Sequence, residues 1–237
     1  MSLPGYVPGM PRIGSVRATS PRIIFRDDGV LWALSGGKVI DGSKSRDPDN
    51  TGQVGVLRPG LLMGKITSSG KYAPSIIGKS NAAYAAGATT LTLTSQAVTE
   101  ISRRIGSSGT FKIVGPPAAS GVVAEETVTF SALPSSTTAT ITALANSYIS
   151  GALIRPTDGS EAPLSLISEF FNAQTGVPIF DVDGTTELDV PFEWFPIGGV
   201  LISANIINYP SDSSLKNWVR YQLSSIPGGK FVFDDLY

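Results

Sequence analysis

The sequence contains no cysteine and no histidine, and charged residues make up only 16% of its 237 positions. Without cysteine, the chain can form neither a disulfide nor a thiolate zinc site. Without histidine, it cannot build a Ser-His-Asp triad, a Cys-His dyad or a common zinc hydrolase site, because imidazole supplies the base or the ligand in each. Chemistry based on carboxylate pairs or on serine and lysine stays open. We expect no metal, no cofactor and no enzymatic activity.

A dominant charge of one sign and a long apolar run are also missing. The formal net charge is −1, so the chain lacks the overall positive field that attracts nucleic acid. No window reaches the ~18 uncharged apolar residues of a membrane-spanning helix. The N-terminal residues lack the apolar core of a signal peptide. We therefore expect a soluble protein, with neither nucleic acid nor a membrane as partner.

Glycine (26 residues) and proline (17) are abundant, which favours short strands joined by turns over long helices. A chain of this length can bury about 70% of its unfolded surface in a core. The predicted fold class is mainly β with few short helices (α+β). We expect a small barrel-like or sandwich-like body, an inserted β-rich module and an extended N-terminal arm.

Residues 1–22 form the predicted arm, because the prolines at positions 4, 8, 11 and 21 exclude a regular helix or a central strand. A solvated, disordered tail is the alternative. Positive charges precede the first acid, Asp27, and apolar side chains lie between them, so an arm laid on an acidic neighbour is favoured. The residues expected to bind that neighbour are Tyr6, Val7, Arg12, Ile13, Val16, Arg17 and Arg22.

The predicted body comprises residues 23–79 and 158–237. Its clearest feature is a hairpin of about 15 residues, in which strand 61–66 turns at Gly70 and returns from Lys71. Ser211 is expected to cap a helix over 212–224. The other expected elements are strands 23–25, 30–34 (ended by Gly36-Gly37), 177–182, 188–195, 200–207 and 230–234, and a polar loop over 41–53.

Residues 80–157 form the predicted module, since alanine, threonine and serine dominate there and apolar residues alternate with polar ones. The expected strands are 89–94, 110–114, 126–133, 138–144 and 152–154, with a helix over 98–105. We expect this module to have a core of its own. Its ends, near Lys79 and Asp158, should lie close together because an insertion returns the chain to its starting point.

Short motifs suggest ligand sites only weakly. Gly78-Lys79-Ser80 resembles the end of a phosphate-binding loop, but Ala73 stands where that motif needs glycine. Asp181–Gly184 and Asp47–Asn50 resemble calcium loops, yet the first lacks the required glycine and glutamate, and both fit ordinary turns.

The acidic and aromatic residues have similar alternatives. Two pairs of acids, Glu125 with Glu126 and Glu187 with Asp189, could serve a glycosidase, but solvated surface is the preferred interpretation. The three tryptophans lie within apolar runs, which favours a place in the core or an interface over a sugar platform; they are Trp32, Trp194 and Trp218.

Three segments carry a family resemblance. LRPGLLMGKITSSGKYAPS, residues 57–75, resembles the signature hairpin of phage head decoration proteins, with a Pro-Gly turn, a Gly-Lys strand and a Gly-Lys-Tyr turn. Residues 198–235 resemble the end of longer members of that group. Residues 90–117 resemble a β-rich module inserted in some phage head proteins. Together they cover about half of the chain.

This resemblance implies a structural virion protein, similar to the small lambda-type decoration protein. Such a protein is made in the host cytoplasm, binds the outer surface of the expanded capsid and stabilises it. The implied partners are the major capsid protein and further copies of this chain, in a trimer or else a dimer. The greater length and the insertion depart from the family pattern and leave the oligomer and the contact site open. Two other classes remain as alternatives: a phage tail, baseplate or receptor-binding module, and a carboxylate-dependent glycosidase.

Overall fold

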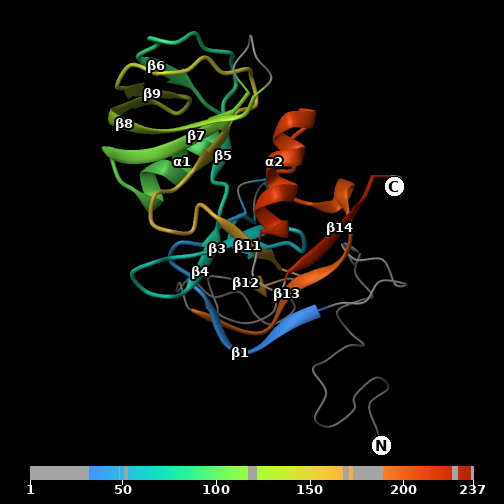
Figure 1. The fold of residues 1–237 in the computed structure, drawn as a ribbon. Coiled ribbons are helices and arrows are strands. Elements are labelled where there is room, and N and C mark those ends of the chain that lie inside the picture. The colour runs from blue at the N-terminus through green and yellow to red at the C-terminus, as the bar shows by residue number, and fades with distance from the viewer. Residues whose placement is uncertain are drawn as a thin grey trace, which may run out of the picture.

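The computed structural model describes residues 32–47, 49–50, 53–116, 122–167, 171–172, 189–225 and 229–235. These residues form a mainly β structure with two α-helices, which confirms the predicted fold class. Figure 1 shows two β-rich parts, one above the other. The predicted arm and the expected strands 23–25 and 177–182 lie outside the described residues.

The lower part, here called the body, contains a curled six-stranded sheet. In spatial order its strands are β11 (Pro163–Leu166), β3 (Leu62–Lys65), β4 (Tyr72–Pro74), β1 (Trp32–Ile40), β13 (Val190–Ile202) and β14 (Lys230–Asp234). The predicted hairpin is confirmed, since β3 and β4 pair antiparallel and Gly70 adopts a positive φ of 72° at the bend. Beside this sheet, β2 (Val56–Leu57) pairs with β12 (Phe171–Asn172).

Two strands of the body are longer than the sequence predicted. Gly36-Gly37 does not end β1, because the pairing with β13 shifts register between Ser35 and Lys38 and then continues to Ile40. This irregularity absorbs the glycine pair as a β-bulge does. Likewise the expected strand 188–195 and the start of the expected strand 200–207 belong to one strand, β13, which ends at Ile202 and pairs with β1 along its first half and with β14 along its second. A 3₁₀ turn, η2 (Ser203–Asn205), follows it.

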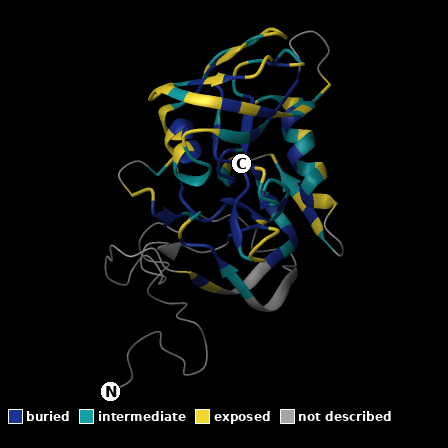
Figure 2. Ribbon diagram, turned by 90° about the vertical axis from the view of Figure 1, so that its left-hand side faces the viewer, coloured by how far each residue is buried: buried dark blue, intermediate teal, exposed yellow. Residues whose placement is uncertain are grey.

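The upper part, here called the module, contains a second six-stranded sheet. Its strands, in spatial order, are β5 (Gly78–Lys79), β10 (Leu153–Arg155), β7 (Gly109–Gly115), β8 (Ala124–Ser135), β9 (Thr138–Ile141) and β6 (Thr90–Thr92). The chain enters along β5 and leaves along β10, and these two strands pair antiparallel. Figure 2 shows exposed residues spread over the outer side of this sheet.

Both predicted helices are present, although each begins at a different residue from the one expected. Helix α1 (Ser95–Arg104) starts three residues earlier, because the Thr94 hydroxyl accepts a hydrogen bond from the Ala97 amide. Helix α2 (Ser213–Ser224) is capped by Asp212 and not by Ser211. The Asp212 carboxylate accepts bonds from the amides of Ser214 and Leu215, both at 2.9 Å.

Apolar side chains gather in three clusters. One belongs to the module and packs the inner face of its sheet against α1; it includes Leu91, Leu93, Phe111 and Phe130. A second lies within the body, around Ile40, Leu57, Met63 and Ile207. The third joins the two parts, because Val114 and Leu153 of the module pack with Leu62, Leu201, Leu215, Val219 and Phe231 of the body.

Candidate functional site

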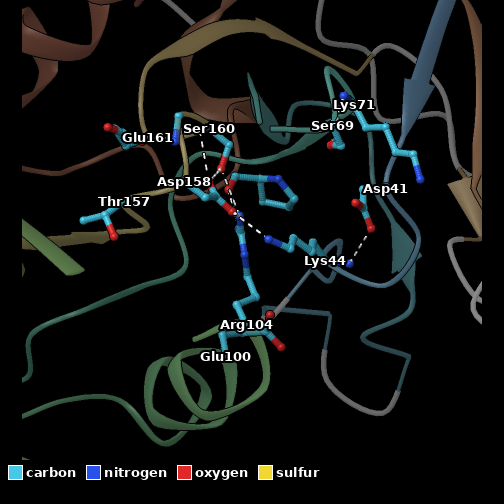
Figure 3. A network of polar contacts seen from close by, with 12 residues as sticks. Asp41, Lys44, Ser69, Lys71, Glu100, Arg104, Thr157, Asp158, Ser160 and Glu161 are labelled. Carbon is cyan, nitrogen blue, oxygen red and sulfur yellow. Dashed lines mark hydrogen bonds and ion pairs between the residues drawn. The ribbon is translucent and has the colours of Figure 1, made fainter. Parts of the chain in front are cut away.

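A network of polar contacts lies where the module meets the body (Figure 3). We call it the junction network and define it as Lys44, Arg103, Arg104, Asp158 and Ser160. It brings together the loop after β1, the end of α1, and the segment between β10 and β11. Three segments far apart in the sequence therefore meet through charged groups.

Arg104 is the centre of this network. Its side chain is only 1% exposed. One guanidinium nitrogen, Nη1, donates to the Pro74 carbonyl at 2.7 Å. The other, Nη2, donates to Asp158 Oδ2 at 3.2 Å and to Ser160 Oγ at 2.9 Å. Burial lowers the pKa of Arg104, and the charge of Asp158 acts against that shift.

Asp158 receives contacts from three directions. Besides Arg104, Lys44 Nζ approaches its Oδ2 at 3.4 Å, and the hydroxyl and amide of Ser160 donate to its Oδ1 at 2.5 and 3.1 Å. Partial burial alone would raise the pKa of Asp158, but the Ser160 hydrogen bonds and the Arg104 charge hold that pKa below its ordinary value. Asp158 is thus stabilised as a carboxylate, which suits an acceptor and not a general acid.

The neighbouring arginine of α1 extends the network. Arg103 donates to the carbonyl oxygens of Ser43 and Lys44 and forms an ion pair with Glu100 at 2.5 Å. Asp41 shapes the same loop, since its carboxylate accepts bonds from the Ser43 hydroxyl at 2.6 Å and the Lys44 amide at 3.1 Å. The end of α1 is therefore fixed to the loop after β1.

A second group of charged residues, around Arg155 at the end of β10, also connects the module to the body. Arg155 has a side chain that is only 3% exposed, and its guanidinium carbon lies 4.5 Å from the centre of the Trp218 ring on α2. The same guanidinium donates to Glu125 on β8 at 2.8 Å and to the Glu161 carbonyl at 2.8 Å. Lys112 Nζ joins the carboxylates of Glu125 and Glu161, at 3.0 and 3.1 Å.

The loop 41–53 is not a solvated loop throughout, contrary to what its polar sequence suggests. Asp41, Ser45, Arg46 and Asp47 are all buried. Asp47 pairs with Arg58 through two contacts, of 2.6 Å to Nε and 3.0 Å to Nη2. Burial of a carboxylate is tolerated here because the arginine supplies charge and paired hydrogen bonds together.

The acidic pairs are arranged for structure. Glu125 and Glu126 are adjacent on β8, so their side chains point to opposite faces of the sheet. Glu126 accepts bonds from the amides of Ala145 and Asn146, at 2.8 and 3.2 Å. Asp189 forms an ion pair with Lys71 at 2.6 Å, whereas Glu187 lies outside the described residues.

The remaining motifs also have structural explanations. A Cβ atom added to Gly78 would come within 2.1 Å of the Ala97 Cβ, so this glycine permits β5 to pack closely against α1. Within the described residues, no group of three or more acids forms a possible metal site. Trp218 packs against the shared apolar cluster, which agrees with the predicted place in the core or an interface. Asp181–Gly184 and the side chains of Trp32 and Trp194 lie outside the part of the chain that the structure describes.

The residues predicted to bind a partner are not placed. Tyr6, Val7, Arg12, Ile13, Val16, Arg17 and Arg22 all lie outside the described residues, so their role stays a prediction. Sequence reasoning gave no role to Arg104 or Arg155 and named Asp158 only as the end of the predicted module. The only available signal was the pair of arginines in the last turn of α1, a pattern that also fits a solvated helix end.

Comparison with known proteins adds no relative. No protein-family model, no curated protein and no solved structure matches this chain. Among the described residues, no helix has the length and apolar character needed to cross a membrane.

Proposed function

We propose that this chain is a structural protein of a phage virion, which binds the outer surface of the assembled capsid and stabilises it. The observation that carries this proposal is the arrangement of residues 57–75, the segment that resembles the decoration-protein hairpin. They form the β3–β4 hairpin within the body sheet. A Cβ added to its Gly64 would lie 2.0 Å from the Ser160 carbonyl oxygen, so the motif glycine serves close packing beside the junction network.

The rest of the structure suits this task. The shared apolar cluster and the buried arginines couple module and body, which supports a rigid clamp in place of two independently moving parts. A rigid body that bridges several capsid subunits turns weak individual contacts into tight attachment. The proposed partners are the major capsid protein and other copies of this chain, as a trimer or else a dimer.

Binding to purified expanded capsids tests the proposal. Full-length protein should bind in a saturable, stoichiometric manner, and a chain lacking residues 1–20 should stay folded but bind far more weakly. A triple variant, Arg12→Glu, Arg17→Glu and Arg22→Glu, should also lose binding if the arm meets an acidic surface. A charge-matched comparison uses single reversals: Arg12→Glu in the arm should weaken binding more than Lys65→Glu at an exposed position on β3.

Two outcomes contradict the proposal in different ways. Equal binding of the truncated and full-length chains removes the role of the arm. Absence from the capsid in a cryo-EM map of the virion, with density at the tail or baseplate, favours the alternative class of phage structural module.

A further inference from the structure

We propose that two copies of this chain pair through strand β14, in antiparallel register centred on Val232. This inference concerns contact between two copies in solution, and it holds whether or not the chain binds a capsid. Strand β14 lies at the end of the body sheet, with β13 on one side and no further strand of the described residues on the other (Figure 1). The outer backbone groups of such an edge strand can pair with another strand.

The sequence of β14, Lys-Phe-Val-Phe-Asp, is complementary to itself when reversed. Antiparallel pairing about Val232 places Lys230 of each copy opposite Asp234 of the other. It also places Phe231 opposite Phe233 and Val232 opposite its own counterpart. Opposite charges and apolar side chains directly across a strand pair are favourable, whereas like charges are unfavourable.

The charges also select this register over others. Parallel pairing in register would set Lys230 against Lys230 and Asp234 against Asp234. A shift of two residues would set either Lys230 or Asp234, depending on its direction, against Val232 and would leave the other charge without an opposite charge across the pair. Lysine on an edge strand generally discourages pairing with unrelated strands, so the charged ends favour a second copy of this strand over other partners.

The side chains of β14 are divided between two faces in a way that fits such pairing. Phe231 is buried in the shared cluster, and the Phe233 ring lies 5.2 Å from the Arg220 guanidinium carbon of α2. Val232 points the other way and is 59% exposed, one of few large apolar side chains so exposed among the described residues. Lys230 and Asp234 share its face and also interact within their own chain, so pairing adds to those contacts.

A five-residue strand pair buries less area than the ~1,200–2,000 Å² of a stable interface, so the dimer should be weak. Sedimentation equilibrium of the wild type over a wide concentration range should show monomer and dimer in exchange. Lys230→Asp alone places two acids opposite each other at both ends of the strand pair, and Asp234→Lys alone places two lysines there. Each should weaken association at least tenfold.

An equimolar mixture of Lys230→Asp and Asp234→Lys chains restores opposite charges at both ends, so a heterodimer should form. Lys65→Asp, at an exposed position of β3 away from this edge, is the charge-matched control and should dimerise normally. Thermal melting verifies that each variant is folded. Hydrogen exchange of the wild type gives a test without variants, because protection of the 230–234 amides should rise with protein concentration.

The proposal is overturned by a wild type that stays monomeric up to about 1 mM, well above the affinity range of weak specific pairs. It is equally overturned if self-association occurs but ignores both charge variants, or leaves exchange at 230–234 unchanged. Neither result affects the capsid-binding test, which depends on a different segment.

Discussion

Arg155 of the module lies over the ring of Trp218 in the body, with 4.5 Å between the guanidinium carbon and the ring centre. Arg104 of the module makes a second connection to the body, because its guanidinium donates a hydrogen bond to the carbonyl of Pro74. Both side chains are almost fully buried, so each charge depends on partners within the protein and not on water. The relative placement of the two sheets therefore depends on a few long-range polar contacts as well as on the shared apolar cluster.

Replacing Arg155 by methionine should reduce the free energy of unfolding by about 2 kcal/mol, because a nearly buried group that donates several hydrogen bonds is removed, although Lys112 still pairs with Glu125. Glu125 would lose its closest partner, and the Glu161 carbonyl would lose its donor. Urea unfolding measures the change. Lys71→Met is the control, since the Lys71–Asp189 pair is exposed, and it should change stability far less. Equal losses in the two variants would contradict a special role for the buried arginine.

Stability should fall in acid partly through Asp158. Its folded-state pKa is held below the ordinary value, so its contribution is complete above an unfolded pKa of about 3.9 and disappears as the pH falls through the lowered folded pKa. Asp158→Asn removes this titration. We expect the variant to be less stable than the wild type at pH 7, with the difference shrinking below pH ~4. Parallel stability curves across this range would show that Asp158 carries no such linkage.

Gly64→Ala should be strongly destabilising, because the added methyl would lie 2.0 Å from the Ser160 carbonyl oxygen and 2.6 Å from that of Ala162. These are backbone atoms, so relief requires the segment after β10 to move. Gly87→Ala is the control: Gly87 has a positive φ of 86° but no neighbour within 4 Å, so only backbone strain of about 1–2 kcal/mol is expected. Thermal melting of both variants measures the two losses of stability. A smaller loss for Gly64→Ala than for Gly87→Ala would contradict the prediction.

Asp212→Ala should cost about 1 kcal/mol, the usual effect of removing a helix cap. The amides of Ser214 and Leu215 would lose their acceptor. Ser211→Ala, one residue earlier, should leave stability nearly unchanged. Chemical denaturation of the two variants distinguishes the caps, and a larger effect at Ser211 would contradict the observed helix start.

Replacing residues 80–157 by a short Gly-Ser linker should leave a body that still melts cooperatively, because the chain enters and leaves the module on paired strands. Its melting temperature should fall, since Val114 and Leu153 would no longer cover Leu62 and Val219 in the shared cluster. Calorimetry measures the transition. Complete loss of the melt would show that the body cannot fold without the module.

Local sequence pattern predicted the elements whose stability depends mainly on near neighbours. Alternation in 89–94 and 138–144 and the hairpin bend at Gly70 follow from the preferences of a few adjacent residues. Leu215, Val219 and Leu223, which stand at helical spacing in the sequence, form the buried face of α2 in the same way. The absence of cysteine and histidine likewise excluded whole classes of site without any structure.

Tertiary structure alone decided which charges are buried and where strands continue. Asp47 was interpreted from the sequence as a turn residue, because its burial depends on a partner from another segment, Arg58. The same holds for the continuation of β1 through its glycine pair, which pairing with β13 stabilises. Such contacts join residues far apart in the chain, and local preference carries no information about them.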